Sequence, residues 1–474
     1  MHVGIKPMCI FLLSKVKGEM SMKNKIKPSL LPGFMELCPK EQMIFNDMVG
    51  RMIKVYEQNG CMPMDTPIIE KEEILLAKSA GETEKQVYRI ANEKRKQALR
   101  FDLTVPFARY VVQNRNELTF PFKRYQFGKV YRGERNQKGR YREFYQLDID
   151  VVNIARLATS YDAFVMSLAA QAFQSIGLES YVFQMSNRKI LSGFLELLGV
   201  ERQQEVMGAI DKYDKIGRES CEQEIEALIG KSKSGYIKEL LQLSGELEEM
   251  LQKLRVFSEK LRGQFCMEDA QPEGMGYLKM LEGIGELEEV VKTLKWLGVE
   301  DKNVKIQLKI IRGLDYYTGT IFETIIQGNE GYGSICSGGR YDDLAALYTD
   351  LKMPGVGISI GVTRLFFVLK EIGFLENYRL LEESSYLIIS LGDTLKECIA
   401  INQVLQRNGI KSEVYFNQDS LKKQLKYADA KAIEKVVIIG EDELKEGKLV
   451  IKDMNTGNQI KVNQEEWLAN KSWS

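Results

Sequence analysis

The sequence predicts an α/β protein with more than one domain, and three regions of the chain support this prediction. Residues 122–152 contain two strand-like segments around a charged loop, which is the pattern of a long antiparallel hairpin. Residues 155–300 are mainly helical, because leucines recur there at helical spacing. Between residues 386 and 439, strand and helix patterns alternate, which is typical of a small α/β unit with a mixed sheet.

The length and charge composition fit a globular protein whose surface carries both signs of charge. The chain has 474 residues, which is long enough for two or three domains. Its 66 basic residues balance 66 acidic ones, so the net charge is zero. A uniformly basic surface for nucleic acid is therefore excluded, and any RNA contact must come from local patches.

The cysteine and histidine counts restrict the possible chemistry. The seven cysteines are scattered and never form a C-x-x-C pair, so we expect no zinc knuckle or disulfide framework, and a reducing cytoplasm fits best. The single histidine is His2. This count excludes Ser-His-Asp catalysis, Cys-His catalysis and histidine-ligated metals. The chemistry must use carboxylates, arginines, tyrosines, lysines or the substrate itself.

The N-terminal region begins with an extension. We expect residues 1–27 to be disordered, and their apolar run Met8–Leu13 is too short for a membrane span. A helical pattern starts at Pro39 and stops at Gly60, and a strand-like segment near Pro67 follows.

The stretch from Lys309 to Glu323 has the composition of a polar pocket. Residues 304–310 alternate between apolar and polar side chains, which predicts a strand, and residues 320–326 read as a second strand. Between them lie an arginine, an aspartate and two tyrosines, beside two glycines that let the backbone approach a ligand. A polar turn between two strands is the alternative for this stretch alone.

Two polar residues, Asp102 and Thr104, suit an ammonium group. They are two positions apart, so in an extended chain they project to the same side. A carboxylate and a hydroxyl at that spacing would accept hydrogen bonds from an ammonium. A solvated loop is the alternative.

The predicted hairpin combines basic and aromatic side chains. These are Arg132, Arg140 and Arg142, with Tyr131, Phe144 and Tyr145. Guanidinium groups beside aromatic rings suit the phosphates and the base of a nucleotide. Basic hairpin loops are also common on protein surfaces.

Two glycine-containing segments follow the central stretch. Residues 336–343 predict a glycine-rich turn that leads into a helix near Leu344. Residues 355–367 predict a buried strand that enters a helix with Arg364 in its first turn. An arginine there opposes the helix dipole, which indicates an anionic ligand.

Together these segments resemble the histidyl-tRNA synthetases, a family of class II aminoacyl-tRNA synthetases. Residues 312–317 match the family's Arg-Gly-Leu-Asp-Tyr-Tyr peptide nearly residue for residue, and residues 338–342 resemble its second peptide. Residues 39–67, 122–152 and 355–367 resemble the three class II motifs in chain order. The resemblance extends over about residues 28–470.

The resemblance implies a fold with several domains. Residues 28–180 and 301–375 would form an α/β catalytic domain with an antiparallel sheet flanked by helices. Residues 181–300 would form a mainly helical insertion, and residues 385–474 an anticodon-binding α/β domain. The charge runs of the insertion also fit a solvated helix face, and Lys422, Lys423 and Lys426 fit a solvated surface.

The resemblance also implies roles for individual residues. The catalytic residues would be Arg312 and Arg132. The ATP-binding residues would be Arg132, Glu134, Arg140, Phe144 and Arg364. The histidine-binding residues would be Asp102, Thr104, Gln146, Asp150, Arg312, Tyr316 and Tyr317. The tRNA-binding residues would be Arg135 and Gln137, with Asn136 where the family commonly has proline.

The implied activity is that of a histidine–tRNA ligase. It would form histidyl-adenylate from L-histidine and ATP with Mg²⁺, and transfer the histidine to tRNA(His), as a cytoplasmic homodimer. Activation needs no side-chain base, because the attacking carboxylate is ionised at neutral pH. It needs positive charge around the phosphate, which arginines and magnesium would supply. Tyr317 and Asp150 would read the imidazole, which offers one donor and one acceptor.

Two alternatives belong to other classes of protein. A regulatory paralogue would bind histidine and tune ATP phosphoribosyltransferase without charging tRNA. Such paralogues generally lack the anticodon domain and have degraded ATP-binding arginines, whereas this chain has both. A non-catalytic sensor of uncharged tRNA would normally be fused to a kinase, and the sequence carries no kinase signature.

Overall fold

The computed structural model describes residues 27–77, 82–91, 95–134, 138–213, 217–265, 272–311, 316–379 and 385–470. The chain divides after Asn377 into two compact units. The expected N-terminal extension, residues 1–27, lies outside the described residues except for its last position.

The larger unit is built on an eight-stranded sheet. Its strand order is β1-β4-β5-β10-β9-β8-β6-β7. The six inner strands pair antiparallel, and the edge strands β1 and β7 pair parallel to their neighbours. The bounds are Met62–Pro63 (β1), Phe122–Tyr131 (β4), Glu143–Val152 (β5), Tyr181–Asn187 (β6), Val304–Ile306 (β7), Thr320–Ile326 (β8), Cys336–Tyr341 (β9) and Gly355–Gly361 (β10). The expected antiparallel hairpin at residues 122–152 is confirmed as β4 and β5.

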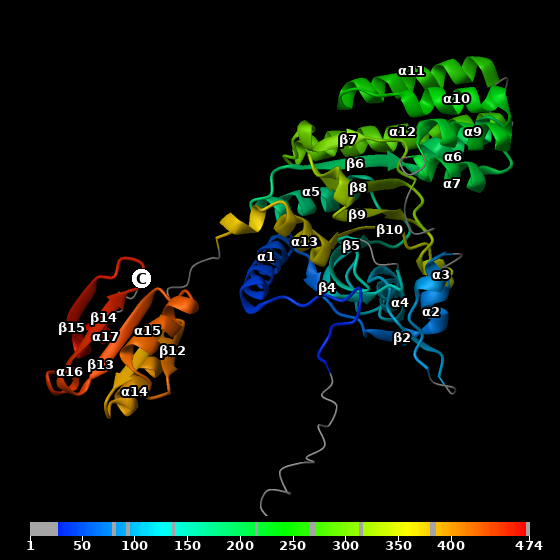
Figure 1. The fold of residues 1–474 in the computed structure, drawn as a ribbon. Coiled ribbons are helices and arrows are strands. Elements are labelled where there is room, and N and C mark those ends of the chain that lie inside the picture. The colour runs from blue at the N-terminus through cyan, green and yellow to red at the C-terminus, as the bar shows by residue number, and fades with distance from the viewer. Residues whose placement is uncertain are drawn as a thin grey trace, which may run out of the picture. The chain divides into compact units, whose positions relative to one another are not determined.

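Three helices cover one face of this sheet. They are α1 (Pro39–Gln58), α5 (Ser160–Ser175) and α13 (Val362–Glu371), which Figure 1 shows along one side of the strands. The helix expected from Pro39 is confirmed as α1, and Phe45 of α1 packs against Tyr145 of β5 and Phe366 of α13. Since the side chains of a strand alternate, burying this face leaves the other face of β5 free for polar groups.

Short elements border the other face near β4. They are α2 (Glu72–Leu76), α3 (Glu82–Gln86), α4 (Thr104–Gln113) and the strand pair β2 (Ile69–Lys71) and β3 (Gln97–Leu99). Thr104 begins α4, so the expectation of an extended chain from Asp102 to Thr104 is wrong. The carboxylate of Asp102 instead accepts a hydrogen bond from the backbone N–H of Val105 (3.1 Å), which satisfies a free donor of the first helical turn.

A group of helices lies between β6 and β7 in the chain. They are α6 (Arg188–Leu197), α7 (Gln203–Asp211), α9 (Arg218–Ile229), α10 (Lys231–Gln242), α11 (Leu247–Phe265) and α12 (Pro272–Trp296). Strand β6 lies inside the range expected for the insertion, 181–300, but it pairs with β8 in the main sheet. The main sheet therefore extends past the expected boundary at residue 180, because the buried run Tyr181–Asn187 pairs with β8 on one side and β7 on the other.

Two local expectations around the glycines are wrong, and one predicted strand is shorter than expected. The segment expected to be a glycine-rich turn is strand β9, which can pair closely because Gly338 has no side chain: an added Cβ would lie 2.1 Å from the carbonyl oxygen of Gly357. The helix expected near Leu344 is a single 3₁₀ turn, Ala345–Leu347. The predicted strand at residues 304–310 ends after Ile306.

The smaller unit is an α/β domain with a mixed sheet of order β12-β11-β13-β14-β15. Its strands are β11 (Tyr386–Leu391), β12 (Ser412–Tyr415), β13 (Lys435–Gly440), β14 (Lys448–Asp453) and β15 (Gln459–Asn463), and its helices are α14 (Leu395–Arg407), α15 (Leu421–Ala430), α16 (Glu441–Lys445) and α17 (Gln464–Asn470). Apolar clusters lie on both faces of the sheet. The alternation of strands and helices predicted from residue 386 is confirmed.

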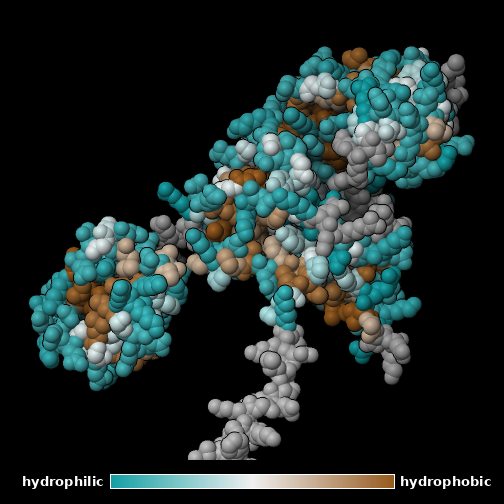
Figure 2. Space-filling view, viewed as in Figure 1, coloured by the Kyte–Doolittle hydropathy of each residue, from teal (hydrophilic) through white to brown (hydrophobic). Residues whose placement is uncertain are grey.

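The visible surface of each unit is mostly hydrophilic, with hydrophobic residues in separate patches (Figure 2). Among the described residues, none of the helices combines the length and the apolar content needed to cross a membrane.

Candidate active site

A cavity of about 1150 Å³ opens over the face of the sheet that α1, α5 and α13 leave uncovered. Most of the residues singled out from the sequence line it, although they come from segments far apart in the chain. These residues are Asp102, Thr104, Arg132, Glu134, Arg140, Phe144, Gln146, Tyr316, Tyr317 and Arg364.

Strand β5 forms the floor of this cavity. Phe144, Gln146 and Asp148 alternate along the strand and line the cavity, whereas Tyr145 packs against Phe45 and Phe127 on the covered face. Ser359 of β10 lies opposite Asp148 and accepts a hydrogen bond from the Gln146 side-chain amide (2.6 Å). The floor is therefore polar and held by contacts between neighbouring strands.

Asp102 supplies a buried carboxylate at one end of the cavity. Its side chain is 3% exposed, and its Oδ2 atom has no hydrogen-bond partner among the described residues. Burial raises the pKa of the Asp102 carboxyl to about 6, although the Val105 N–H and the nearby Arg132 act in the opposite direction. A bound cation would favour the ionised carboxylate, so this end of the cavity suits an ammonium group.

Arg132 and Phe144 lie together beside Asp102. The guanidinium carbon of Arg132 is 5.2 Å from the ring centre of Phe144, which is within range of a cation–π contact. The Arg132 Nε atom donates to the carbonyl oxygen of Phe101 (3.0 Å), so its position is fixed while its other nitrogens can face the cavity. An arginine held in this way suits a phosphate.

Three further charged residues surround this end. Arg140 and Glu134 are paired at 3.3 Å, and the Arg140 side chain is partly exposed. Arg364 lies in the first turn of α13, as expected, and its Nη2 atom donates to the carbonyl oxygen of Tyr332. This end of the cavity thus combines Arg132, Arg140 and Arg364 with an aromatic ring, which is the composition of a nucleotide site.

Tyr316 and Tyr317 form a second wall, with ring centres 4.8 Å apart. Burial raises the pKa of both phenols, and the nearby carboxylates of Asp150 and Asp148 raise that of Tyr317 further. Both phenols therefore stay protonated and can donate a hydrogen bond. Arg188, the first residue of α6, donates from Nη1 to the carbonyl oxygen of Tyr317 (2.9 Å).

Asp150 lies in the same row as Gln146 and Asp148 but does not line the cavity. Its carboxylate forms an ion pair with Arg124 (2.5 Å) and accepts a hydrogen bond from the Tyr341 hydroxyl (2.8 Å). Burial raises the pKa of the Asp150 carboxyl, and Arg124 opposes that shift. Asp150 is therefore already paired with Arg124 and Tyr341, and the sequence did not indicate these contacts.

Several residues of this site were not predicted from the sequence. The period-2 pattern of β5 could have found Asp148, because it places that residue on the same face as Gln146. No signal pointed to Arg124 or Arg188, whose partners are distant in sequence. One face of α7, at helical spacing, was not predicted either; it is formed by Gln204, Met207, Gly208 and Asp211, with Lys212 directly after the helix.

Three of the expected site residues, Arg312, Arg135 and Gln137, lie outside the described residues. Within the described parts of the chain, no group of three or more histidine, cysteine, aspartate or glutamate side chains could hold a metal ion. Mg²⁺ commonly uses only one or two carboxylates together with substrate phosphates. Glu323 of β8 is a carboxylate residue on the cavity wall, so the residues present fit that mode of binding.

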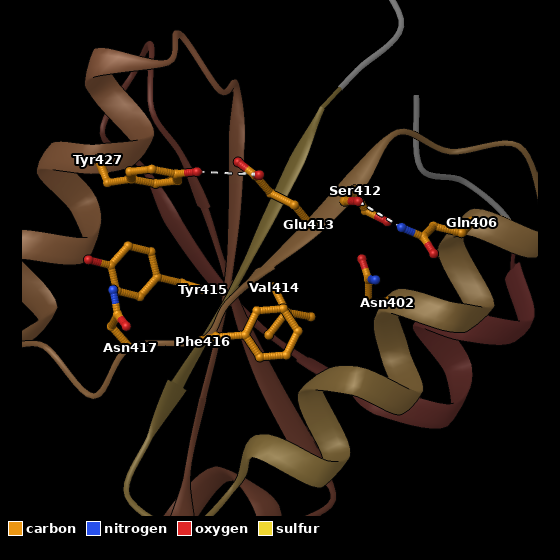
Figure 3. Close-up of a pocket in the computed structure, with 9 residues that line it drawn as sticks. All are labelled: Asn402, Gln406, Ser412, Glu413, Val414, Tyr415, Phe416, Asn417 and Tyr427. Atoms are coloured by element: carbon orange, nitrogen blue, oxygen red, sulfur yellow. Dashed lines mark hydrogen bonds between the residues drawn. The ribbon is translucent and has the colours of Figure 1, made fainter.

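The C-terminal unit has a separate cavity of about 480 Å³ beside the edge strand β12 (Figure 3). Phe416 is 68% exposed there. The side-chain oxygens of Asn402 and Ser412 are buried without a hydrogen-bond partner among the described residues. Glu413 is paired with Lys431 (2.8 Å), so its charge is compensated.

Comparison with known proteins agrees with this geometry. A model of the family described as histidyl-tRNA synthetase matches residues 33–365, and one described as anticodon binding domain matches residues 386–470. A histidine–tRNA ligase from Clostridium acetobutylicum is 58% identical over 446 residues, covering 94% of this chain and 100% of that protein. One from Finegoldia magna is 41% identical, covering 92% of this chain and 97% of that protein.

Solved structures give the same result. The crystal structure of histidyl-tRNA synthetase from Nostoc sp. PCC 7120 superimposes with a TM-score of 0.81 at 34% identity, covering 94% of this chain and 99% of that one. An ATP phosphoribosyltransferase regulatory subunit/histidyl-tRNA synthetase from Bacillus halodurans C superimposes with a TM-score of 0.68 at 20% identity, covering 87% of this chain and 99% of that one. At that identity the likeness shows the fold alone.

The sheet, its flanking helices and the arginine-lined cavity define a class II aminoacyl-tRNA synthetase. The matches over nearly the whole chain then identify the family: the chain belongs to the histidyl-tRNA synthetases. Activity as an ATP-dependent ligase of histidine and tRNA follows from this membership.

Proposed function

We propose that the main cavity activates L-histidine with ATP and then transfers the histidine to the 3′ end of tRNA(His). The observation that carries this proposal is that one cavity combines a carboxylate for an ammonium group with arginines for phosphates. Asp102 lines the same cavity as Arg132, Arg140 and Arg364. Histidine and ATP can therefore meet over the floor formed by β5.

Histidine binds at the end of the cavity near Asp102 and the two tyrosines. Asp102 and Thr104 hold the α-ammonium group, and the Tyr317 phenol donates to the imidazole. Tyr316 packs beside Tyr317, and Asp150 supports the pocket from its buried position. The residues assigned to histidine are Asp102, Thr104, Gln146, Asp150, Arg312, Tyr316 and Tyr317.

ATP binds at the end near Phe144. The adenine stacks on the Phe144 ring, and Glu134 accepts from its amino group, while Arg132 contacts the α-phosphate. The residues assigned to ATP are Arg132, Glu134, Arg140, Phe144 and Arg364. Mg²⁺ is bound with the phosphates, and Glu323 is the wall carboxylate that would hold it; when bound, the ion neutralises phosphate charge.

The chemical step needs positioning and charge rather than a base. The histidine carboxylate is already ionised near neutral pH, so no group has to remove a proton before attack on the α-phosphate. Negative charge develops on the phosphoryl oxygens in the transition state, and fixed cations stabilise it. Arg132 and Arg312 are the catalytic residues in this account.

The C-terminal cavity binds an unpaired base of the tRNA anticodon. The exposed ring of Phe416 suits base stacking, which contributes about 1–3 kcal/mol per base. The unpartnered oxygens of Asn402 and Ser412 can accept hydrogen bonds from a base edge. In Figure 3, Asn402 and Phe416 border the same space. Arg135 and Gln137 of the hairpin loop contact the other end of the tRNA.

The protein acts as a cytoplasmic homodimer in this proposal. Apolar side chains near the edge of the sheet support an interface: Met62 is 59% exposed, Ile69 48% and Ile68 41%. Exposed apolar patches of this kind mark association surfaces. Sedimentation at increasing protein concentration checks the dimer, and a monomer at all concentrations would contradict it.

The test of the main proposal is charging of tRNA(His) with labelled histidine. Wild-type protein is expected to charge the tRNA, and Arg132→Ala is expected to reduce the rate of adenylate formation by about 10²- to 10³-fold, as for loss of one charge-stabilising donor. Near-normal activity of this variant would remove the role of Arg132. Histidine binding without any charging would instead favour the regulatory paralogue.

The tRNA contact is tested separately. Phe416→Ala is expected to raise the KM for tRNA about 10-fold and to leave adenylate formation unchanged, because stacking is lost only from the RNA complex. Ile460→Ala is the matched control, since Ile460 is also exposed (57%) but lies on β15 at the opposite edge of the sheet. An equal effect of both substitutions would contradict the assignment.

A further inference from the structure

Arg188 connects the helical insertion to the segment that follows the peptide at residues 312–317. It is the first residue of α6 and comes directly after strand β6. Its Nη1 atom donates to the carbonyl oxygen of Tyr317 (2.9 Å), and its backbone N–H donates to the carbonyl oxygen of Gly319 (2.9 Å). The side chain and the backbone of one residue therefore hold two carbonyl groups of the same short segment.

Strand β9 holds this segment from the other side, because β8 lies between β6 and β9 in the sheet. The backbone N–H of Thr318 donates to the carbonyl oxygen of Arg340 (2.8 Å), and the Thr318 hydroxyl donates to Asp342 (2.7 Å). A Cβ added to Gly319 would lie 3.0 Å from the Arg340 side chain, so the backbone passes close to β9. Without Arg188, the Tyr317 carbonyl would lose its contact on the side of β6.

The position of Arg188 is set by the close packing of α6 against α12. A Cβ at Gly193 would lie 2.5 Å from the carbonyl oxygen of Gly276, and one at Gly283 would lie 2.8 Å from the backbone nitrogen of Ile190. Glycines at these positions let the two helix backbones approach each other. Because closely packed interiors transmit displacements, a shift of α12 would carry the N-terminus of α6 with it.

Polar contacts fix the N-terminus of α6 to the same helix. Asn187, which is 0% exposed, accepts from the backbone N–H of Lys189 (2.9 Å) and donates to Glu286 of α12 (2.7 Å). The Lys189 ammonium group pairs with Glu286 (2.5 Å) and with Glu282 (2.8 Å). Arg188 lies between these two anchored residues, so its backbone is fixed relative to α12.

We infer that Arg188 is a positioning residue for the activation reaction, and that it couples the placement of the helical insertion to the wall of the main cavity. A hydrogen bond from a charged donor to a carbonyl oxygen is stronger than one between neutral groups. Removing this donor would release the backbone of Tyr317, whose side chain lines the cavity. This inference rests on the proposed function.

A direct contact between Arg188 and a phosphate is the alternative that the test has to separate, because Arg188 itself lines the cavity. A positioning residue acts through Tyr317, at the histidine end of the proposed site, so its loss would raise the KM for histidine. A residue that binds phosphate would instead raise the KM for ATP. The two roles therefore differ in which KM responds.

The test uses Arg188→Met in the full chain, because methionine keeps an unbranched apolar side chain and removes the donors. Histidine-dependent exchange between pyrophosphate and ATP is measured while each substrate is varied in turn. The KM for histidine is expected to rise by about 10-fold, because a hydrogen bond from a charged donor is lost, and the KM for ATP is expected to stay nearly unchanged. Arg188→Lys is expected to recover part of the affinity, since an ammonium group can still donate to the Tyr317 carbonyl.

The matched control is Arg218→Met. Arg218 is also the first residue of a helix in the insertion, α9, but it pairs with Glu222 of the same helix (2.8 Å). Its substitution is expected to leave both KM values unchanged. If it raises the KM for histidine as much as Arg188→Met, the effect belongs to the charge of the insertion in general and the inference is overturned.

The outcomes separate the inference from the function beneath it. If the wild-type protein shows no histidine-dependent exchange, the proposed function fails. If the wild type is active and Arg188→Met keeps the wild-type KM for histidine, or raises the KM for ATP to the same degree, the inference alone fails. If Arg188→Met does not fold, Arg188→Gln, which is polar but shorter than arginine, provides the same measurement.

Discussion

The guanidinium of Arg124 and the carboxylate of Asp150 lie opposite each other on β4 and β5 and form an ion pair of 2.5 Å. Arg124 is 0% exposed and Asp150 1%. The guanidinium carbon also lies 4.5 Å from the ring centre of Phe107, on α4. This pair joins the sheet to the helix that follows Asp102, so it supports the Asp102 end of the cavity from below.

Removing the arginine of this pair is expected to destabilise the catalytic unit. Arg124→Met leaves the Asp150 carboxylate buried without its cation, and breaking a buried pair in this way costs about 3–5 kcal/mol. The measurement is the denaturant midpoint of the unfolding transition. Lys302→Met is the control, because its pair with Glu300 is exposed and such pairs contribute little to stability. Equal shifts for the two variants would refute the prediction.

Close packing over the Arg124–Asp150 pair predicts that a side chain at Gly357 destabilises the protein. A Cβ at Gly357 would lie 2.1 Å from Asp150 Oδ1 and 3.0 Å from the carbonyl oxygen of Ile149. Gly357→Ala is expected to lower the free energy of unfolding by about 1–3 kcal/mol. Gly361→Ala, in the same strand, is the control because its nearest neighbour would be at 3.6 Å. A stable Gly357→Ala with normal histidine binding would contradict this packing.

The buried aspartates predict how histidine binding depends on pH. The pKa of Asp102 is raised to about 6 and that of Asp148 to about 7, in both cases mainly by burial. The ionised carboxylates attract the ammonium group, so histidine affinity is expected to fall as the pH is lowered from 8 to 6. Calorimetric titration with histidine checks this, and a flat profile would disagree with it.

The same shifts predict the pH dependence of stability. A carboxyl whose pKa is higher in the folded state holds its proton more tightly there, so its contribution to stability is lost as the pH rises through the folded-state pKa. For Asp148 this loss occurs between pH 4 and 7. Asp148→Asn is therefore expected to be more stable than the wild type at pH 8, by about 4 kcal/mol, and closer to it at pH 4.5. Melting temperatures of both proteins at the two pH values check this. A wild type that is more stable than Asp148→Asn at pH 8 would contradict the prediction.

Arg340 is expected to be a structural residue of the second histidine-family peptide. Its guanidinium donates to both carboxylate oxygens of Asp162 and to the carbonyl oxygens of Leu157 and Ala158, at 2.7–3.2 Å. A lysine cannot reproduce this planar set of bonds. Arg340→Lys is therefore expected to lower the denaturant midpoint at a cost of about 2–4 kcal/mol. An unchanged midpoint would contradict this role.

Much of the fold could be predicted because its patterns are local. The hairpin β4–β5, helix α1 and the entry of β10 into α13 follow from alternation, proline and glycine. The strand β9 could not be predicted from its own residues, since glycines disfavour strands unless another backbone approaches closely, as Gly357 does. The start of α4 at Thr104 was also missed, because the Asp102 contact with the Val105 N–H depends on the folded loop.

The residues of the candidate site could also be predicted only in part. Residues that belong to a continuous motif, such as Arg132, Phe144 and Gln146, line the cavity as expected. The state of Asp150 could not be predicted, because Arg124 and Tyr341 reach it from β4 and β9. Contacts between strands that are distant in sequence decide which carboxylate faces a ligand.

The measurement that tests the central claim most directly is exchange between pyrophosphate and ATP, with each amino acid supplied in turn. This exchange reports adenylate formation without tRNA. The account predicts exchange with histidine and none with the other amino acids. Histidine binding with no exchange, or exchange supported equally by other amino acids, would contradict it.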